Sequence, residues 1–558
     1  MLKNLKNLIQ TELNEKLSKE YNALVSLVVE VPKDRSMGDL AVPAFPLCRI
    51  LHKNPQECAE IVKSHLDELD YFSSVEIVGG YVNASYSKEK LSHEILKNLD
   101  EKEVVKGKTI AFDYSSPNIA KPFSIGHLRG TVLGEALANL FEYRGYNVVR
   151  INYLGDFGTQ FGKLIWAFKK WGNMEEVEKS PIDTLVKLYV RFNNEAKENP
   201  EMDDEAREIF KELEEGNAEY THLWETFKEY SIKEFMRMYD LLGIKFDYYA
   251  SEASASHNCP RVINILKEKN LLVKDNGAEV VDLGENKNPA IILKSDGSTI
   301  YLSRDLSEIY DRYDKFHFDT MAYVVGNEQK LHFVELRDVL NKMDAPFKDS
   351  VVHINFGLIL QGGKKMSTRN GVSIKLDDVL KESIKLAKKH IEEKNANLEN
   401  KDEIATKVGV SAVIFNDLRN FRENDYEFNL EDATRFEGQT GPYVQYTSVR
   451  IASILNQRVL DESKIDYKMY QEDSMFNLLQ LLDEREDVID RCISEYAPNY
   501  FAKYLLSLST EFNSFYAKER VLVEDEKELN TKLYILKKIK ETLDLGMRLL
   551  NMSVVEKM

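Results

Sequence analysis

A strand–helix–strand segment in the first third of the chain constrains the fold most. TIAFDYSS (109–116) is an apolar strand that ends in small polar residues. Apolar residues then recur at helical spacing as far as Gly145, and NVVRINYL (147–154) is a second apolar strand. Two strands joined through one helix lie parallel in the same sheet, and ligands of such sheets bind at the carboxyl ends of the strands. We therefore expect an α/β fold with a ligand site where the first strand meets the helix.

Residues 1–105 are expected to form a small α/β domain. An amphipathic helix opens the chain, an apolar segment follows at 24–31, a helix lies near 54–68, and 75–87 is strand-like. A charged stretch then separates this domain from the first strand of the parallel sheet.

Residues 106–404 are expected to hold the parallel sheet. A largely acidic helical insertion covers 161–242, and strands alternate with helices again over 290–360. From 405 to 558 the pattern is almost wholly helical, with aromatic and leucine stripes, and is typical of a helix bundle.

Composition excludes several classes of protein. The 558 residues suffice for roughly three to four domains. No run approaches ~18 apolar residues, so no transmembrane helix is expected, and the N-terminus lacks the apolar core of a signal peptide. The net charge of −18 leaves a nucleic-acid partner open, because phosphate binding depends on local lysines and arginines. The cysteines are scattered without a CxxC pair, which argues against a zinc site and fits a reducing cytoplasm: Cys48, Cys58, Cys259 and Cys492.

The first chemical motif is SSPNIAKPFSIGHLRG (115–130), at the predicted strand-to-helix turn. Backbone N–H groups and the helix dipole make such a turn an anion site. Gly126 lets the backbone approach a nucleotide, His127 can donate a hydrogen bond to a phosphate, and Lys121 adds a mobile positive charge. For an isolated Gly-His pair, a plain capped turn is the commoner interpretation.

The second motif is GGKKMSTRNG (362–371). Its glycines and basic residues make a flexible cationic loop, which suits a triphosphate whose charge is redistributed during phosphoryl transfer. A solvated basic turn is the commoner interpretation for a lone instance. The order and combination of the two motifs therefore matter more than either one.

Together the motifs resemble the HIGH and KMSKS signatures of class I aminoacyl-tRNA synthetases, as SIGH (124–127) and KMSTR (365–369). The resemblance spans essentially the whole chain. It implies a Rossmann-like parallel-sheet catalytic domain with helical insertions, an N-terminal tRNA-binding domain and a C-terminal anticodon-binding helix bundle. Five further segments are similar to the arginine enzymes of this class: SSPNIAKPF (115–123), NYLGDFGTQFG (152–162), TIYLSRD (299–305), GNEQKLHF (326–333) and FEGQTGPYVQYTSVR (436–450).

The resemblance implies an activity and its partners. L-Arginine would be activated with ATP to arginyl-adenylate and transferred to the 3′-terminal adenosine of tRNA(Arg), with release of pyrophosphate and AMP. Mg²⁺ is expected with the ATP, held chiefly by phosphate oxygens rather than by protein ligands, and no protein-bound zinc is expected. The resemblance also implies a cytoplasmic monomer without a membrane partner, as is usual for such enzymes.

The signatures depart from the family pattern at two positions. Ser124 stands where HIGH has its first histidine, and Thr368 replaces the second lysine of KMSKS. A serine reaches less far than a histidine, so Ser124 is expected to contact phosphate only through water or a shifted backbone. His127, Lys121 and Lys365 are then the main catalytic candidates.

The substrate pocket follows partly from chemistry. Arginine presents a planar, always charged fork of donors, which carboxylates hold in bidentate geometry. Tyr301 and Asp305 are four residues apart and share one face of a helix, which alone is more typical of a surface pair. By the resemblance, Asn118, Tyr301, Asp305 and Gln329 bind arginine, with Asp113 as a partner where similar enzymes often carry glutamate.

The resemblance also gives the ATP site. Adenine is expected to meet the backbone around 356–358, and NYLGDFGTQ is expected to serve either the adenosine, the tRNA 3′ end or a structural turn through Asp156 and Gln160. The expected ATP-binding residues are Ser116, Asn118, Gly126, His127, Phe356, Gly357, Leu358, Lys365, Met366 and Ser367.

Contacts with tRNA are predicted in both outer domains. Aromatic faces can stack on unpaired bases and arginine can bind phosphate, although aromatic residues in a bundle can equally be core. The candidates are Tyr443, Gln445, Tyr446 and Arg450 in the C-terminal domain and Asn83 and Tyr86 in the N-terminal domain.

Two alternatives are weighed against this function. A class I synthetase for cysteine would need zinc ligands, and one for glutamate a cationic pocket. A paralogue that binds tRNA without charging it would explain Ser124 and Thr368, but the remaining signature residues are intact.

Overall fold

The computed structural model describes residues 2–32, 34, 37–119, 121–285, 287–366 and 374–558. The chain forms two compact units. One comprises 1–102, 447–489 and 504–544, and the other comprises 103–446, 490–503 and 545–558.

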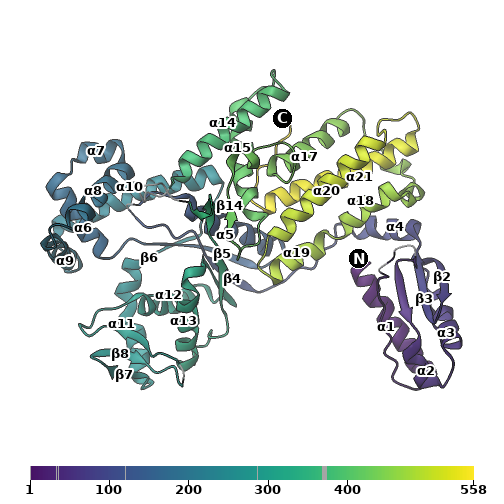
Figure 1. Ribbon diagram of the computed structural model, residues 1–558, viewed down its shortest axis with the longest axis horizontal. Coiled ribbons are helices and arrows are strands. Elements are labelled where there is room, and N and C mark those ends of the chain that lie inside the picture. The colour runs from purple at the N-terminus through teal and green to yellow at the C-terminus, as the bar shows by residue number, and fades with distance from the viewer. Residues whose placement is uncertain (1, 33, 35–36, 120, 286, 367–373) are drawn as a thin grey trace. The chain divides into compact units, whose positions relative to one another are not determined.

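A five-stranded sheet forms the centre of the second unit, and all of its strands are parallel (Figure 1). Helix α5 (Ile125–Tyr143) joins two neighbouring strands, and Gly145 follows it with a φ of 91°. This confirms the α/β fold with a parallel sheet predicted from the strand–helix–strand pattern. The order is β11 (Val351–Phe356), β10 (Thr320–Gly326), β4 (Thr109–Asp113), β5 (Asn147–Leu154) and β6 (Tyr248–Ser251).

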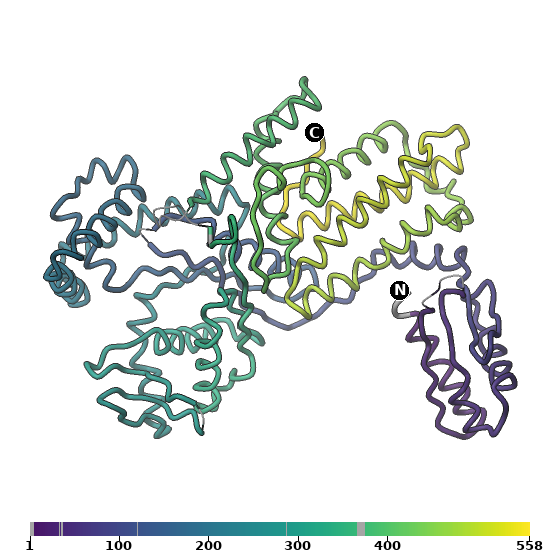
Figure 2. Tube along the Cα trace, in the orientation of Figure 1, coloured from purple at the N-terminus to yellow at the C-terminus, as the bar shows by residue number. Residues whose placement is uncertain are grey.

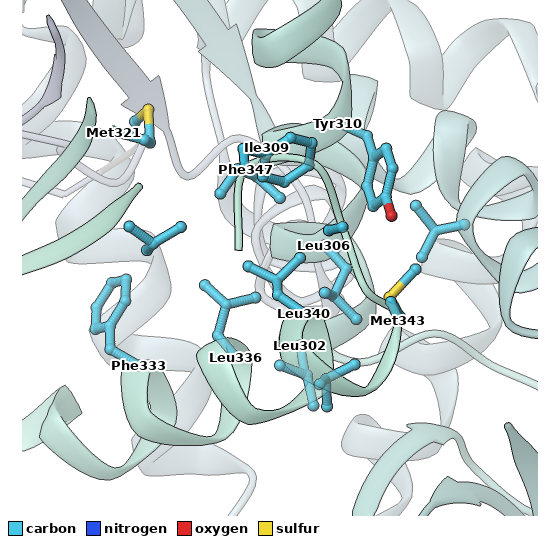
Figure 3. Packing of buried hydrophobic residues seen from close by; sticks show 14 of the residues in the cluster. Leu302, Leu306, Ile309, Tyr310, Met321, Phe333, Leu336, Leu340, Met343 and Phe347 are labelled. Carbon is cyan, nitrogen blue, oxygen red and sulfur yellow. The ribbon is translucent and has the colours of Figure 1, made fainter. Parts of the chain in front are cut away.

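A hydrophobic core fixes the rotation of helix α12 (Tyr301–Phe316) beside this sheet. Leu302, Leu306 and Ile309 recur at helical spacing and are buried against α13 (Lys330–Lys342) and β10 (Figure 3). Because that face of α12 packs in the core, Tyr301 and Asp305 lie on another face of the helix. The core therefore positions the two residues predicted to recognise the substrate.

Further helices and a small sheet are inserted between the strands of the second unit. The helical stretch predicted over 161–242 consists of five helices. A three-stranded antiparallel sheet follows α11, and the sequence did not predict it. These elements are α6 (Thr159–Trp171), α7 (Met174–Lys179), α8 (Pro181–Glu195), α9 (Glu201–Glu214), α10 (Ala218–Leu242), α11 (Glu252–Glu268), β7 (Leu272–Asp275), β8 (Ala278–Val281) and β9 (Ala290–Leu293).

The N-terminal segment 24–31 is extended but is not a regular strand. Its backbone N–H groups donate to side chains of helix α1 (Leu2–Tyr21): Leu27 N–H to Asn14 Oδ1 at 2.7 Å and Val29 N–H to Gln10 Oε1 at 2.9 Å. Buried and exposed residues alternate along it. Polar side chains of a helix thus accept the N–H groups of Leu27 and Val29, and Glu30 alone forms an antiparallel bridge, to Ala41.

The strand-like segment 75–87 belongs to a hairpin instead of a single strand. Strands β2 (Phe72–Val78) and β3 (Tyr81–Tyr86) pair antiparallel around Gly79 and Gly80, whose φ values are 59° and 91°. The Gly-Gly pair is a turn signal that the apolar pattern concealed. The other elements here are β1 (Leu40–Pro43), α2 (Phe45–Leu51), α3 (Pro55–Asp67) and α4 (Lys88–Asn98).

The C-terminal part is helical, as predicted, and the helices begin before residue 405. Lys532 Nζ of α21 donates to the carbonyl of Arg520, in the loop that follows α20, at 2.9 Å. Figure 2 traces the helical C-terminal part in green to yellow. Among the described residues, no helix is long and apolar enough to cross a membrane. The helices are α14 (Leu376–Lys394), α15 (Lys401–Leu418), α16 (Leu430–Ala433), α17 (Gly441–Leu455), α18 (Asp473–Asp483), α19 (Arg485–Ser494), α20 (Asn499–Lys518) and α21 (Glu526–Leu549).

One buried arginine ties α5 to the segment that follows α15. The Arg129 side chain is 1% exposed and donates to the Asn424 carbonyl at 2.7 Å and the Phe421 carbonyl at 3.2 Å. Its Nε lies 3.5 Å from the buried Asp417 carboxylate, and its guanidinium lies over the Tyr426 ring at 5.0 Å. The guanidinium is therefore held by two hydrogen bonds, an ion pair and an aromatic ring.

Replacing Arg129 with methionine should destabilise the second unit. The change leaves the Asp417 carboxylate buried without its cation, which costs about 3–5 kcal/mol for a buried pair. Calorimetry should show a lower unfolding temperature for Arg129→Met. The double variant Arg129→Met/Asp417→Asn, which removes the unpaired charge, should recover part of the loss. Equal unfolding temperatures for the natural and Arg129→Met proteins would contradict this.

Candidate active site

The turn after β4 has an unusual backbone. Ser115 and Ser116 have positive φ values of 75° and 44°. The Ser115 hydroxyl lies 2.8 Å from both the Thr131 hydroxyl and the Tyr239 hydroxyl, and the Ser116 hydroxyl donates to Asp113 Oδ1 at 3.0 Å. A left-handed non-glycine residue costs of order 1–3 kcal/mol and persists only when its surroundings enforce it. These hydrogen bonds hold the turn open at the carboxyl end of the central strand.

Asn118 reaches the neighbouring strand end. Ile119 N–H donates to the Gly155 carbonyl at 3.0 Å, and a Cβ at Gly155 would lie 2.3 Å from Asn118 Oδ1. Gly155 therefore leaves room for the Asn118 side chain. The structure brings Asp113, Ser116 and Asn118 together on one turn.

Ser124 is the N-cap of α5, and His127 lies against it. The Ser124 N–H donates to His127 Nδ1 at 3.0 Å, and the Ser124 hydroxyl is also 3.0 Å from Nδ1. Because Nδ1 accepts from a backbone N–H, the proton of the neutral ring sits on Nε2. Gly126 is exposed, and a Cβ there would meet only the Ser124 hydroxyl at 3.5 Å. Lys121 is exposed on the same turn.

The first signature motif is hydrogen-bonded to residues 374–376, which follow the second motif in the sequence. Ile125 N–H donates to the Ile374 carbonyl, and Leu376 N–H donates to the Phe123 carbonyl, each at 2.9 Å. The chain directly after the KMSTR motif is therefore bonded to both sides of Ser124. Lys375 also forms an ion pair with Asp183 of α8.

The chain before the KMSTR motif forms a short hairpin of β12 (Ile359–Gln361) and β13 (Lys364–Lys365). The N–H groups of Gly362 and Gly363 donate to the Glu427 carboxylate at 2.9 and 2.5 Å. Glu427 lies in β14 (Tyr426–Glu427), which pairs with β12. Met366 is buried, whereas the Lys365 side chain and Ser367 lie outside the described residues.

The backbone expected to meet adenine, around 356–358, is already hydrogen-bonded to residues 422 and 425. Gly357 N–H donates to the Arg422 carbonyl at 2.9 Å, and Leu358 N–H donates to Asp425 Oδ1 at 2.6 Å. A Cβ at Gly130 would lie 3.1 Å from the Phe356 ring, so this ring packs on α5. A base at this position would therefore find neither the Gly357 nor the Leu358 N–H available.

Tyr301 and Asp305 lie in the first turns of α12, as their spacing predicted. Tyr301 is 69% exposed, and Asp305 Oδ2 lies 2.6 Å from His332 Nε2. Gln329 ends the short 3₁₀ helix η2 (Asn327–Gln329) and is exposed. The sequence did not predict that His332 contacts the Asp305 carboxylate.

The expectation for Asp113 needs correction. Its carboxylate lies 2.8 Å from the Arg312 guanidinium, and both side chains are buried. Burial raises the pKa of Asp113, and Arg312 opposes that rise. An arginine of the protein itself thus occupies the carboxylate that was expected to assist in binding the substrate.

Two further carboxylates belong to this region. Burial raises the pKa of both Glu252 and Glu308 to about 7; Arg304 opposes the rise at Glu252 and Arg312 at Glu308, while the negative charge of Asp305 adds to both. When ionised, both carboxylates add to the negative charge around Asp305. Glu308 is three residues after Asp305 and could have been found from helical spacing. Glu252 follows β6, a strand that the sequence pattern did not reveal.

Asp156 has a structural role. It is 0% exposed, its carboxylate accepts from Lys228 Nζ at 2.5 Å and from Ala253 N–H at 3.1 Å, and its carbonyl accepts from Trp224. Gln160 is half-buried at the start of α6. Of the roles considered for this segment, Asp156 therefore has the structural one.

Two of the predicted tRNA contacts need correction because their side chains are buried. Gln445 is 0% exposed and donates to the Ser553 carbonyl at 2.7 Å, so it anchors the C-terminal segment. Asn83 is 8% exposed in the middle strand of its sheet. Neither side chain is open to a base.

The other predicted tRNA contacts are half-buried: Tyr443, Tyr446, Arg450 and Tyr86. Lys394 Nζ lies 4.4 Å from the Tyr446 ring centre, and Arg450 Nη1 is 2.5 Å from Asn513 Oδ1. Tyr86 stacks on Phe72 with 5.6 Å between ring centres. Part of each side chain remains on the surface.

A parallel sheet that carries SIGH on the turn after its central strand, hydrogen-bonded to the chain after KMSTR, defines the catalytic domain of a class I aminoacyl-tRNA synthetase. Residues 90–430 match the family model "tRNA synthetases class I (R), catalytic domain", residues 444–558 the "DALR anticodon binding domain", and residues 3–86 the "Arginyl tRNA synthetase N terminal domain". The chain belongs to the arginyl-tRNA synthetase family. The boundaries after 105 and 404 remain predictions.

Similar proteins cover nearly the whole chain. The arginine–tRNA ligase of Lactobacillus acidophilus is 44% identical over 96% of both chains, and that of Ligilactobacillus salivarius is 44% identical over 99% of this chain and 98% of its own. The solved arginyl-tRNA synthetase of Plasmodium falciparum is 25% identical, with a TM-score of 0.80 over 99% of each chain. That of Thermus thermophilus is 23% identical and shares the fold, with a TM-score of 0.82 over 99% of this chain and 100% of its own.

Glu427 is a positioning residue that the sequence did not reveal, and it can be tested. Glutamine at 427 keeps the size but offers one accepting oxygen to two N–H donors, so the hairpin before KMSTR should be held less firmly. We expect Glu427→Gln to slow adenylate formation by about ten-fold. The matched control Glu431→Gln, on the exposed side of α16, should leave the rate unchanged. Equal rates for both variants in single-turnover assays would contradict the role of Glu427.

Proposed function

We propose that this chain performs the reaction of its family, the ATP-dependent ligation of L-arginine to tRNA(Arg), at the turn between β4 and α5. The observation that carries this proposal is the pair of hydrogen bonds that joins both sides of Ser124 to the chain after KMSTR. It holds the chain that follows KMSTR against the turn of SIGH, which supports a phosphate site shared by the two motifs.

In the proposed pocket, the guanidinium of arginine pairs with Asp305, next to Tyr301. Gln329 and Asn118 supply neutral polar contacts. The carboxylates around Asp305 support a cationic substrate. A pocket of this kind argues against glutamate as the substrate, because a second carboxylate would be repelled.

ATP is proposed to lie over the N-terminus of α5. His127 Nε2–H, the backbone at Gly126 and the ammonium groups of Lys121 and Lys365 face its phosphates. Ser116, Met366 and Ser367 complete this site, with adenine near Phe356. Mg²⁺ is proposed to enter with ATP, held chiefly by its phosphate oxygens. Among the described residues, no group of three or more His, Cys, Asp or Glu side chains is placed to hold a metal.

The proposed chemistry has two displacement steps. A carboxylate oxygen of arginine attacks the α-phosphorus, the bond to the bridging oxygen breaks, and pyrophosphate leaves with that electron pair. A hydroxyl of the terminal adenosine then attacks the acyl carbon, and the bond from that carbon to the oxygen of AMP breaks. AMP leaves with that electron pair, and the hydroxyl proton passes to the departing phosphate or to solvent. No covalent enzyme intermediate forms, so the protein contributes positioning and charge stabilisation.

The remaining parts of the proposal concern tRNA and the cell. Residues 405–558 would bind the anticodon arm, with Tyr443, Tyr446 and Arg450 as contacts, and residues 1–105 would bind the outer corner of the tRNA through Tyr86. We propose a cytoplasmic monomer.

ATP–pyrophosphate exchange tests the function directly. Arginine should drive exchange when tRNA(Arg) is present, whereas cysteine and glutamate should not. A paralogue that only binds tRNA would show no exchange with any amino acid under any condition. Exchange that requires cysteine or glutamate instead would overturn the substrate assignment.

The unusual SIGH signature generates a second prediction. His127→Ala removes the Nε2–H donor, and the loss of one transition-state donor costs ~2.7–4 kcal/mol, so adenylate formation should slow by on the order of a hundred-fold or more. Ser124→Ala keeps the backbone N–H that sets the His127 tautomer, so it should cost under about 1 kcal/mol. Single-turnover rates of both variants decide this. Equal losses would show that the Ser124 hydroxyl contacts phosphate itself.

A further inference from the structure

Asp305 offers only part of its carboxylate to a ligand. Oδ2 lies 2.6 Å from His332 Nε2, and the two side chains are 26% and 21% exposed. His332 lies on α13, whose buried face packs against α12 in the core of Figure 3. The pairing is therefore held by two helices with fixed rotations, and it leaves Oδ1 of Asp305 as the oxygen without this partner.

The charges around His332 determine its protonation. Burial lowers the pKa of His332, but the hydrogen bond and negative charge of Asp305 and the charge of Glu335 raise it, and the net direction is upward. On the β11 side, His353 stacks on Phe333 at 4.3 Å, and burial lowers its pKa to about 4, so it is neutral at physiological pH. His332 is thus poised to titrate against Asp305.

We propose that His332 is a positioning and specificity residue, which holds Asp305 in the orientation that receives the guanidinium and gives up its own proton when arginine binds. The inference rests on the proposed placement of the guanidinium at Asp305. The imidazolium form neutralises Asp305 and repels a second cation. The neutral ring still donates Nε2–H to Oδ2 and leaves the full negative charge for the substrate. The released proton passes to solvent.

Linkage gives the sign of the pH dependence. Free enzyme binds more protons at this pair than the arginine complex does, so arginine binds more tightly as the pH rises through the pKa of His332. The same titration favours arginine over a neutral analogue, because only a cation can displace the proton from His332. Glu252 and Glu308, with pKa values near 7, release protons too, so only a comparison of variants isolates His332.

His332→Gln separates these contributions. Glutamine can donate a neutral N–H to Asp305 but cannot titrate. We expect a kcat close to that of the natural protein and a KM for arginine within a few-fold at pH 7.5. In the natural enzyme, the titration of His332 should lower the KM for arginine by up to ten-fold per pH unit between pH 5.5 and 7.5. In His332→Gln this contribution should be absent, so the KM should depend less on pH. Calorimetric titration of the full chain with arginine in two buffers of different ionisation enthalpy should show fewer protons released.

Three further variants make the test decisive. Glu335→Gln removes a charge that raises the pKa of His332, so it should keep the proton release but move its midpoint to lower pH; this holds even if His332→Gln fails to fold. His390→Gln, a matched change on α14, should alter neither the proton release nor the pH profile.

Unchanged proton release and an unchanged pH profile in His332→Gln would overturn the inference. Asp305→Asn should raise the KM for arginine about ten- to a hundred-fold; a normal KM there would instead overturn the placement of the guanidinium.

Discussion

The site depends on the interaction between Arg129 and the segment 417–427. One guanidinium on the helix of the first motif binds two carbonyls and a buried carboxylate of a segment almost three hundred residues later in the chain. The same segment binds the Gly357 N–H through a carbonyl, the Leu358 N–H through Asp425 and the Gly362 and Gly363 N–H groups through Glu427. Segment 417–427 thereby positions both helix α5 and the hairpin before KMSTR. A shift of this segment would therefore move both elements.

Electrostatics in the arginine pocket follow from a balance of charges. Four carboxylates lie in this region, at 113, 252, 305 and 308, and Arg312 forms ion pairs with two of them, Asp113 and Glu308, inside the core. A desolvated carboxylate without a cation is costly, and its pKa rises until it takes up a proton. At the proposed site, the guanidinium of arginine would remove part of that penalty on binding. A neutral side chain of the same shape would recover none of it.

Local patterns were sufficient to predict the strand–helix–strand unit, the shared face of Tyr301 and Asp305 and the helical C-terminal part. They failed where the deciding partner is distant in sequence. Glu427 and Glu252 contact residues brought near by the fold, and nothing in their own neighbourhoods marks them. His332 lies in the family-like segment GNEQKLHF, but only the fold reveals its contact with Asp305. The predictions for Gln445 and Asn83 were wrong for the opposite reason, because their local sequence suggested a surface position. In the structure, Gln445 is bonded to the Ser553 carbonyl, and Asn83 is buried in a strand flanked by two others. The substitution at Ser124 became intelligible only from geometry, because serine is a favoured N-cap and its backbone N–H meets His127.

The extended segment 24–31 has a consequence for solubility. Strand-like stretches of high β-propensity are templates on which other chains can add, and natural proteins protect them with charges, proline, bulges or a covering element. Here Asn14 and Gln10 of α1 accept the N–H groups of Leu27 and Val29, so part of the hydrogen-bonding edge is already used within the molecule. Side-chain amides thus act as a guard against intermolecular β-pairing. If α1 detached, the apolar run 24–31 would become a nucleus for aggregation, and the integrity of one amphipathic helix would govern how long the whole enzyme stays in solution.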